Sequence, residues 1–243
     1  MKSWLQWSID NLLPRHSILC GYASGTTNIC APCSDELPRI GVCCRKCSLP
    51  LADPGDPVCS HCEKYSVPWN SAIAALVYGF PVDQLVRRFK FSRSLACGQL
   101  LAQELTRAVA NRCIHPPDAI VPVPLHRTRY LARAFNQSEL LARHTGKHLG
   151  VPVYPGLLCR RRRTRAHSGL DAISRRINIK GAFRCRLTSR QHDYVRHIAL
   201  VDDVLTTGAT LSECTRALQA EGIRKVSIWV AARAPEPRAQ PDE

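Results

Sequence analysis

The chain has 243 residues, of which 45% are hydrophobic and 22% charged, and its 34 lysines and arginines exceed its 19 aspartates and glutamates to give a net charge of +15. This composition excludes a disordered chain, a collagen-like repeat and a disulfide-stabilised miniprotein. The positive charge is concentrated, because residues 159–190 carry eleven basic residues against Asp171 alone, whereas residues 1–70 carry six of each sign. Such a field attracts phosphate, either on a small ligand or on nucleic acid.

The N-terminal residues predict a short amphipathic helix that packs on the following domain. The segment has no sustained apolar stretch and no small-residue cleavage site of the kind that a secretory signal carries. The longest nearly uncharged apolar stretch, residues 71–82, is shorter than the roughly 20 residues that cross a bilayer. We therefore expect a cytoplasmic protein without membrane insertion. The apolar residues at helical spacing before Pro14 are Trp4, Leu5, Trp7, Ile9, Leu12 and Leu13.

Eight of the thirteen cysteines precede residue 66. Two C-x-x-C pairs, Cys44/Cys47 and Cys59/Cys62, are separated by a turn-rich connector of eleven residues. This spacing is typical of a structural Zn²⁺ site with four thiolate ligands, which leaves no coordination position for a catalytic water. The alternative is a set of four buried or redox-active thiols.

A third pair, Cys30/Cys33, has an incomplete partner. Cys20 would begin another C-x-x-C pair, but Ala23 stands where its second cysteine would be. Cys20, Cys30 and Cys33 are therefore candidate ligands of a second zinc site. Either Cys43 or His16 supplies the fourth ligand, or the site has been lost. One or two zinc ions are compatible with the sequence.

Three segments in the middle of the chain have a clear pattern. Residues 82–91 predict an amphipathic helix with a basic solvated face. Residues 119–124 predict a strand, because a short apolar run ends in prolines that cannot continue a central ladder. The helix predicted over residues 136–149 begins at Asn136, which either caps the helix or contacts a ligand.

The densest basic cluster comprises residues 160–163 and Arg165. It is either a solvated loop or a phosphate contact, because so much like charge repels itself without a counter-charge. Few aromatic residues accompany it, so the charge favours attraction of phosphate without stacking on bases.

The most specific motif lies near the C-terminus. The apolar run over residues 198–201 lacks alternation and predicts a buried strand of a parallel sheet. Asp202 and Asp203 follow at the carboxyl end of that strand, where open α/β sheets bind ligands. A helical pattern over residues 211–222 and a second buried strand over residues 223–232 come next.

Between the acids and that helix lies a glycine-centred loop. Small residues there let successive backbone N–H groups converge on a phosphate, and the helix N-terminus adds its dipole. The alternative is an ordinary strand–turn–helix connection with a chance pair of acids. Two adjacent carboxylates are unfavourable, however, unless hydroxyls or a metal partner them. The loop consists of Thr206, Thr207, Gly208, Ala209 and Thr210.

These motifs resemble the ComF/GntX family, in which cysteine knuckles precede a type I phosphoribosyltransferase domain. The resemblance covers nearly all of residues 16–234, and its motifs here are V-D-D-V-L-T-T-G-A-T at 201–210, F-K-F at 89–91, V-P-V-P at 121–124, R-A-F-N-Q at 133–137, R-x-x-N at 175–178 and G-A-F at 181–183. It implies a Rossmann-like parallel sheet preceded by a small zinc ribbon. We expect a helix and double-zinc-ribbon-like module in residues 1–70, the phosphoribosyltransferase-like domain in residues 71–234 and a disordered tail in residues 235–243.

The resemblance also implies roles for individual residues. Asp202 and Asp203 would bind the ribose hydroxyls of phosphoribosyl pyrophosphate, which comes with Mg²⁺, and residues 206–210 would hold its 5′-phosphate. Residues 160–176 would form a flexible hood over the site. Candidate contacts to the pyrophosphate or in the hood are Lys90, His126, Arg127, Arg163 and Arg175.

Two departures from the family pattern bear on function. Ala134 replaces the glycine of the R-G-F-N-Q motif, and Thr206 stands where purine enzymes of this fold carry an aspartate that acts on the base. No catalytic residue is therefore identified, and the acceptor is open.

The sequence leaves three hypotheses for function. The first is pentosyl transfer from phosphoribosyl pyrophosphate to an unidentified nitrogen acceptor, linked to DNA uptake or use. The second is a non-catalytic factor that binds single-stranded DNA and works with competence or DNA-uptake proteins. The third is a regulator that senses phosphoribosyl pyrophosphate.

Overall fold

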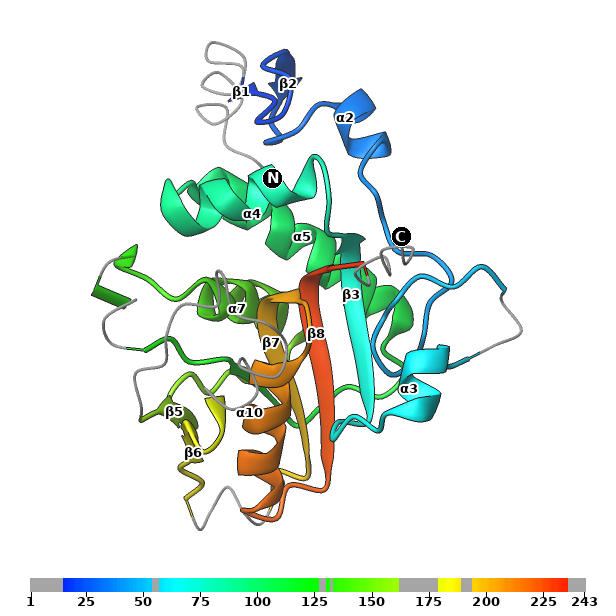
Figure 1. Cartoon of the computed structure of the whole chain (residues 1–243). Coiled ribbons are helices and arrows are strands. Elements are labelled where there is room, and N and C mark those ends of the chain that lie inside the picture. Colours follow the sequence, from blue (N-terminus) through cyan, green and yellow to red (C-terminus); the bar gives the residue numbers. More distant parts are fainter. Residues whose placement is uncertain are drawn as a thin grey trace, which may run out of the picture.

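The computed structural model describes residues 15–53, 57–126, 130–131, 133–161, 179–188 and 194–235. At its centre is a sheet in the order β3-β8-β7-β4, in which every neighbouring pair of strands is parallel (Figure 1). This confirms the predicted α/β class with a Rossmann-like parallel sheet. The strands are β3 (Ser71–Val77), β4 (Ala119–Pro122), β7 (His197–Leu205) and β8 (Lys225–Arg233).

The central strands are hydrophobic on both faces because both faces are covered. Along β7, Ile198 and Leu200 belong to the core on one side of the sheet, and Ala199 and Val201 belong to the core on the other side. All four side chains have no exposed surface. The absence of polar alternation in this segment therefore follows from its central place in the sheet.

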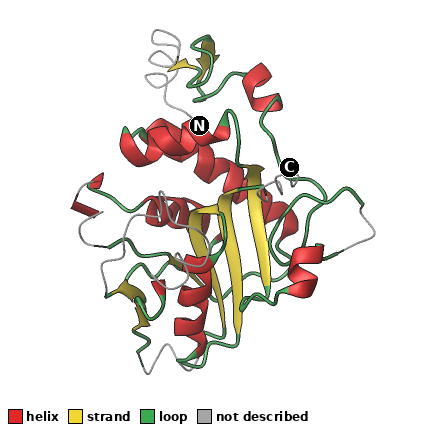
Figure 2. Cartoon of the chain, viewed as in Figure 1, coloured by secondary structure: helices red, strands yellow, loops and turns green. Residues whose placement is uncertain are grey.

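Helices cover the two faces unequally (Figure 2). The buried residues of α4 (Val82–Phe91), α5 (Leu95–Arg112) and α7 (Gln137–Leu149) share one core with one face of the sheet. Those of α10 (Ala209–Gln219) belong to the core on the opposite face. The bounds of α4 match the prediction, whereas α5 was not predicted. In the described chain no helix is both long and apolar enough to cross a membrane.

Other boundaries correct the predictions. The strand predicted over residues 198–201 extends to Leu205, because β8 pairs with β7 as far as Leu205 opposite Arg233. Asp202 and Asp203 therefore lie inside the strand and not after it. Helix α10 ends at Gln219, before a turn in which Gly222 has a φ of 86°.

Two short strands form a hairpin that was not predicted: β5 (Leu158–Arg160) pairs antiparallel with β6 (Phe183–Cys185). Three predicted features lie outside the described residues. These are the N-terminal helix, residues 162–176 of the hood, and the tail after Pro235.

The segment before the sheet packs on the outer edge of β3. It contains the short elements β1 (Arg15–His16), β2 (Ala23–Gly25), α2 (Ala31–Asp35) and α3 (Ser60–Lys64). The backbone N–H of Ile40 donates to Ala75 at 3.0 Å, and that of Val77 donates to Pro38 at 2.8 Å. These bonds cover an edge that would otherwise present unpaired backbone groups. The domain boundary at residue 70 stays a prediction.

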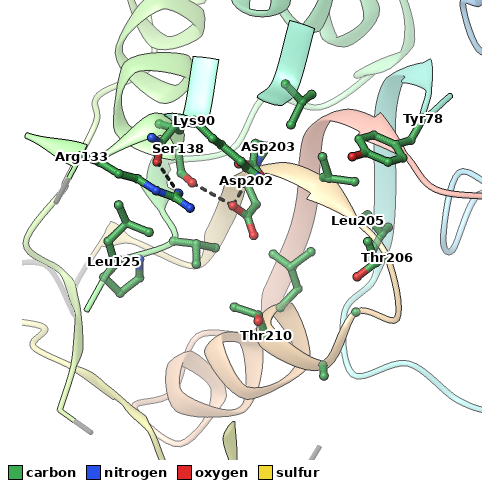
Figure 3. Close-up of a pocket in the computed structure, with 18 of the residues that line it drawn as sticks. Tyr78, Lys90, Leu125, Arg133, Ser138, Asp202, Asp203, Leu205, Thr206 and Thr210 are labelled. Atoms are coloured by element: carbon green, nitrogen blue, oxygen red, sulfur yellow. Dashed lines mark hydrogen bonds and ion pairs between the residues drawn. The ribbon is translucent and has the colours of Figure 1, made fainter. Parts of the chain in front are cut away.

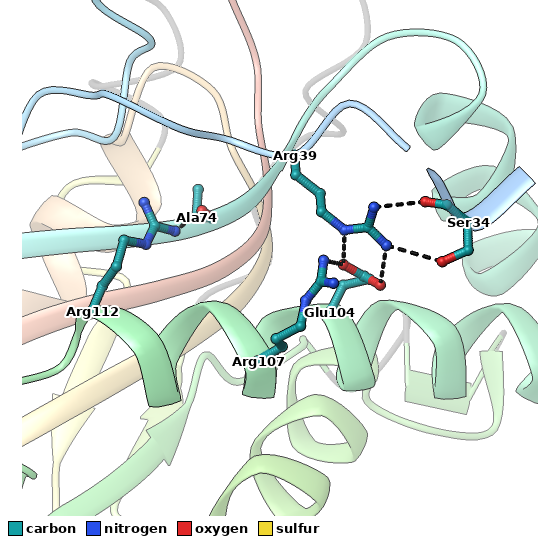
Figure 4. A network of polar contacts seen from close by, with 6 residues as sticks. All are labelled: Ser34, Arg39, Ala74, Glu104, Arg107 and Arg112. Atoms are coloured by element: carbon teal, nitrogen blue, oxygen red, sulfur yellow. Dashed lines mark hydrogen bonds and ion pairs between the residues drawn. The ribbon is translucent and has the colours of Figure 1, made fainter. Parts of the chain in front are cut away.

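A buried carboxylate fastens this segment to α5 (Figure 4). Arg39 donates to both oxygens of Glu104, at 2.9 and 3.1 Å, and also to the carbonyl of Ser34 at 2.6 Å. Arg107 donates to the same carboxylate. Only 9% of the Glu104 side chain is exposed, and burial raises its pKa despite the neighbouring Arg39.

We expect Arg39→Ala to lower the free energy of unfolding by about 2 kcal/mol, because it leaves a buried carboxylate with only one of its two cations. Glu104→Gln should cost less. The raised pKa shows that burial already disfavours the charged form of Glu104, and the amide removes that charge. Urea denaturation at pH 7 measures both variants. Equal losses for the two would contradict this account.

Candidate active site

A cleft of about 810 Å³ lies at the carboxyl end of the sheet. It is lined by residues of α4, by the chain after β4, by the start of α7, by the end of β7 and by the first turn of α10. Figure 3 shows the labelled side chains of Lys90, Arg133, Asp202 and Thr210 converging on this hollow from different elements. The parallel sheet explains the arrangement, because the carboxyl ends of its strands meet at one edge.

The two adjacent acids of β7 have different partners. The Oδ2 atom of Asp203, a residue with 8% of its surface exposed, lies 2.8 Å from Nζ of Lys90. Asp202 accepts hydrogen bonds from Oγ of Ser138 at 2.8 Å and from the backbone N–H of Asp203 at 2.9 Å. Burial, together with the negative charge of Asp203, raises the pKa of Asp202 to about 7. Lys90, predicted as a phosphate contact, therefore neutralises an acid of the site.

The loop of residues 206–210 turns at Gly208, which has a φ of 74° and precedes the first residue of α10. A Cβ at this position would lie 2.7 Å from Cη2 of Trp69, so glycine is required both for the backbone conformation and for the space. Thr206 and Thr207 are exposed. Among the hydrogen bonds of the described residues, none has the backbone N–H of Thr207 or Gly208 as its donor. These groups and the helix N-terminus are suited to an anion.

The structure brings most of the predicted site residues together. Asp202, Asp203, Lys90 and all five residues of the 206–210 loop line the cleft. His126 is described but is not among the lining residues. Arg127, Arg163 and Arg175 lie outside the described residues.

Sequence reasoning missed a second polar group in the cleft. Arg133 donates to Oε1 of Gln137 at 3.1 Å, and its guanidinium carbon lies 5.2 Å from the ring centroid of Phe91. Gln137 is 1% exposed, and its Nε2 has no partner among the described residues. Because it lines the cleft, this donor is available to a ligand. Both residues belong to the R-A-F-N-Q motif, but the chain between them is not helical, so their spacing carried no local signal of the contact.

Two residues between Arg133 and Gln137 were singled out in the sequence, Asn136 for its role and Ala134 for replacing a glycine. Asn136 accepts a hydrogen bond from the backbone N–H of Ser138 at 3.2 Å and donates to the carbonyl of Val123 at 3.1 Å, so it caps α7. Ala134 has a φ of 67°, a conformation that favours glycine. The alanine therefore adopts this conformation at a cost in strain.

The described lining of the cleft is positively charged. Five basic residues face the two carboxylates of Asp202 and Asp203, which leaves a surplus of three positive charges. In a partly enclosed cleft such a surplus draws in an anion. The basic residues are Arg87, Lys90, Arg93, Arg133 and Arg160.

The four cysteines predicted to bind zinc form a cluster beside the sheet. The Sγ atoms of Cys44, Cys47, Cys59 and Cys62 all lie within 4.8 Å of one another, and those of Cys47 and Cys59 are 3.7 Å apart. A Zn–S bond of about 2.3 Å gives a tetrahedral S···S edge of about 3.8 Å, so the cluster fits Zn²⁺. Burial raises the pKa of the Cys47 thiol to about 11, and a bound cation would remove that penalty.

The second candidate site is less complete. Cys20, Cys30 and Cys33 also have Sγ atoms within 4.8 Å of one another, but none of the three is buried. Neither proposed fourth ligand joins them in the part of the chain that is described. Cys43 instead accepts a hydrogen bond from Arg112 at 3.3 Å, and His16 is not in the cluster.

Relatives with known names align with most of the chain. The chain is 36% identical over 180 residues to competence protein F of Haemophilus influenzae, covering 72% of this chain and 78% of that protein. The chain belongs to the ComF/GntX family. Other members of the ComF/GntX family are the DNA utilization protein YhgH of Salmonella typhimurium, 34% identical over 84% of this chain and 90% of its own, and competence protein ComFC of Bacillus subtilis, 24% identical over 80% and 79%.

Two further comparisons add little. No family model matches the chain. Among solved structures, adenine phosphoribosyltransferase of Leishmania tarentolae is similar with 14% identity and a TM-score of 0.28, covering 59% of this chain and 74% of that one. At that score the likeness supports no argument about the site.

We expect one firmly bound zinc ion per chain, held by Cys44, Cys47, Cys59 and Cys62. Cys59→Ser should therefore lose the metal, because three thiolates rarely hold structural zinc. Cys30→Ser, which changes the exposed cluster, serves as the matched control and should keep it. Elemental analysis of the purified variants measures the zinc content. Loss of the metal from Cys30→Ser alone would reverse the assignment.

Proposed function

We propose that the cleft binds the magnesium complex of phosphoribosyl pyrophosphate and that the protein transfers the phosphoribosyl group to a nitrogen acceptor in connection with DNA uptake or use. The observation that carries this proposal is the meeting of the Asp202–Asp203 pair with the Gly208 turn in a single cleft. A pentose phosphate offers hydroxyls to the first group and a phosphate to the second. Membership of a family named for competence and DNA utilization supports the biological setting.

Each part of the ligand has complementary groups in the cleft. The carboxylates of Asp202 and Asp203 can accept hydrogen bonds from the ribose 2′- and 3′-hydroxyls. The backbone N–H groups of Thr207 and Gly208 have no acceptor within the described residues. Together with the threonine hydroxyls, they can donate to the 5′-phosphate. The surplus cations of the lining would meet the pyrophosphate, and Gln137 adds a neutral donor.

The donor set also suits the magnesium that accompanies such a ligand. Carboxylate and phosphate oxygens are the ligands that Mg²⁺ prefers. Within the described residues Lys90 forms its ion pair with Asp203, and Asp202 forms none. When bound, Mg²⁺ would neutralise charge on the departing pyrophosphate. The chain's own contribution is to orient the ribose and to stabilise the leaving group through its cations. We assign no general base.

The predicted hood begins at Arg160, in the strand pair β5–β6. Arg160, at the end of β5, lines the cleft, and its guanidinium carbon lies 5.3 Å from the ring centroid of Phe183 on β6. The ring holds this cation toward the site.

Isothermal titration of phosphoribosyl pyrophosphate with excess Mg²⁺ tests the site. We expect Asp203→Asn to weaken binding roughly 10- to 100-fold, because a hydrogen bond to a charged acceptor contributes about 1.5–3 kcal/mol. Asp118→Asn is the matched control. Its carboxylate accepts from the backbone N–H groups of Arg196 and His197 at the opposite end of the sheet, so binding should be unchanged.

The same experiment separates the alternatives. Absence of binding to the wild-type protein, combined with salt-sensitive binding of a single-stranded oligonucleotide, would favour the DNA-binding hypothesis. Binding without release of pyrophosphate, across a panel of nitrogen acceptors, would favour a sensor of phosphoribosyl pyrophosphate. Equal affinities of the wild type and Asp203→Asn would remove the proposed site.

The raised pKa of Asp202 predicts a pH dependence of binding. The pKa of this carboxyl in the free protein is about 7, and its charged form is the stronger acceptor for a ribose hydroxyl. Affinity should therefore rise from pH 6 to pH 8, with a loss of up to about tenfold for each unit below the pKa. The phosphates of the ligand titrate too, so Asp202→Asn is measured in parallel. The part of the pH dependence that this variant loses belongs to Asp202, and no loss would contradict the assignment.

A further inference from the structure

We infer that the four-cysteine cluster positions the 206–210 loop, through Trp69 and Arg233, so that metal in the cluster and ligand at the loop favour each other's binding. This inference rests on the proposed function only for the identity of the ligand. The mechanical link itself is a property of the fold. The link gives the four-cysteine cluster a role in the site, although none of the described residues before Tyr78 lines the cleft.

The first arm of the link is Trp69, which is 3% exposed. Its indole N–H donates to the carbonyl of Lys46 at 2.6 Å, and Lys46 lies between the metal ligands Cys44 and Cys47. The far edge of the same ring lies against Gly208, where an added Cβ would be 2.7 Å from Cη2. One rigid side chain therefore reaches from residues 44–47, the cysteine turn, to Gly208 of the loop.

The second arm is Arg233, the last residue of β8, which is 8% exposed. Its Nε donates to the carbonyl of Cys47 at 2.9 Å, and its Nη1 donates to the carbonyls of Leu205 and Thr206, both at 3.2 Å. The planar guanidinium fixes these directions relative to one another. The carbonyls of Lys46 and Cys47 are thus both connected to residues 205–208, the first through Trp69 and the second through Arg233.

Arg233 is also an unusual cation. Within the described residues its partners are all backbone carbonyls, and no ion pair to a carboxylate is found. A buried charge without an opposite charge is costly. A phosphate held by the 206–210 loop would bring the missing negative charge close to it, so ligand binding and the position of Arg233 are energetically connected.

The metal enters because it sets the shape of the cysteine turn. The thiols of Cys44 and Cys47 must converge with those of Cys59 and Cys62 for the metal to bind, and this fixes the backbone between them. Ser48, the residue after Cys47, is held to β3. Its Oγ donates to the carbonyl of Ala72 at 2.8 Å and accepts from the backbone N–H of Ala74 at 3.0 Å. Loss of the metal should therefore loosen the carbonyls of Lys46 and Cys47 without detaching the turn from the sheet.

The test is a cycle of metal content against substitution. Titration of phosphoribosyl pyrophosphate with Mg²⁺ is compared for protein with zinc and after zinc has been removed and the chelator dialysed away. In the wild type we expect roughly a tenfold loss of affinity without zinc, about the effect of one hydrogen bond of ordinary strength. Trp69→Phe combined with Arg233→Lys should bind more weakly even with zinc present, and zinc removal should then change its affinity less than twofold.

The substitutions separate position from charge. Trp69→Phe removes the bond to Lys46 and also the outer ring atoms Cη2 and Cζ3 that lie against Gly208, so it cuts this arm at both ends. Arg233→Lys keeps the positive charge but cannot join the carbonyls of Cys47 and Thr206 through one rigid group. If charge alone mattered, Arg233→Lys would keep both its affinity and its response to zinc. That result would overturn the role of Arg233 as a positioning residue.

Matched controls exist in β8 and just before it. Trp229→Phe removes an indole N–H that has no partner among the described residues, and Arg224→Lys changes an exposed arginine at the opposite end of the sheet. Both should keep the wild-type response to zinc. Zinc content and urea denaturation of every variant show whether the metal and the fold are retained.

Hydrogen exchange at the amides of residues 205–210 provides a readout that needs no ligand. We expect exchange there to quicken when zinc is removed from the wild type, and to be quick in the double variant with or without zinc. If the wild type binds no phosphoribosyl pyrophosphate but shows this change, the proposed function fails and the link stands. If it binds the ligand, and zinc changes neither its affinity nor the exchange, the link is wrong and the proposed function stands.

Discussion

The arrangement of this site follows from two adjacent carboxylates on a central, buried strand. Asp202 and Asp203 repel each other and lose hydration, so their place in β7 is tenable only with compensating partners. Lys90 approaches Asp203 from α4, and Ser138 approaches Asp202 from the start of α7. The cleft leaves the rest of the compensation to a ligand. Helices α4 and α7 thus cover one face of the sheet and also deliver the groups that make its acidic pair possible.

The sequence predicted features that neighbouring residues form, but not contacts between residues that are far apart in the chain. The acid pair and the 206–210 loop are contiguous, and a glycine turn between a buried strand and a helix has few possible geometries. The cysteine cluster was predictable for the same reason, from two pairs at close spacing. By contrast, the motif that contains Arg133 and Gln137 does not show locally that the fold sets both residues in the cleft at the end of β7. No local signal showed that Trp69 contacts Gly208, and nothing in the sequence distinguished it from Trp229, the other buried tryptophan of the described residues.

Errors in the predicted boundaries have the same origin. An apolar run marks where a strand is buried, but hydrogen bonding decides where it ends. Pairing with β8 carries β7 past its acids to Leu205, so charged residues lie within a regular strand. The choice between a cap and a ligand contact at Asn136 could not be made from residue type alone, because the same amide serves either role. Its bond to Val123 comes from an adjacent strand end that only the folded chain brings near.

The N-terminal segment is bonded directly to the sheet and to α5, whereas a domain attached only through a linker would lack such bonds. Its backbone covers the edge of β3, and Arg39 reaches the buried carboxylate of Glu104 on α5. Arg233 ends the strand beside β3 and turns its charge toward carbonyls from both the cysteine turn and β7. A cation kept among carbonyl oxygens is stabilised less well than one paired with an anion. Such an arrangement is reasonable where a phosphate completes the site, and it makes the edge-covering segment, the cysteine turn and the loop parts of one structural unit.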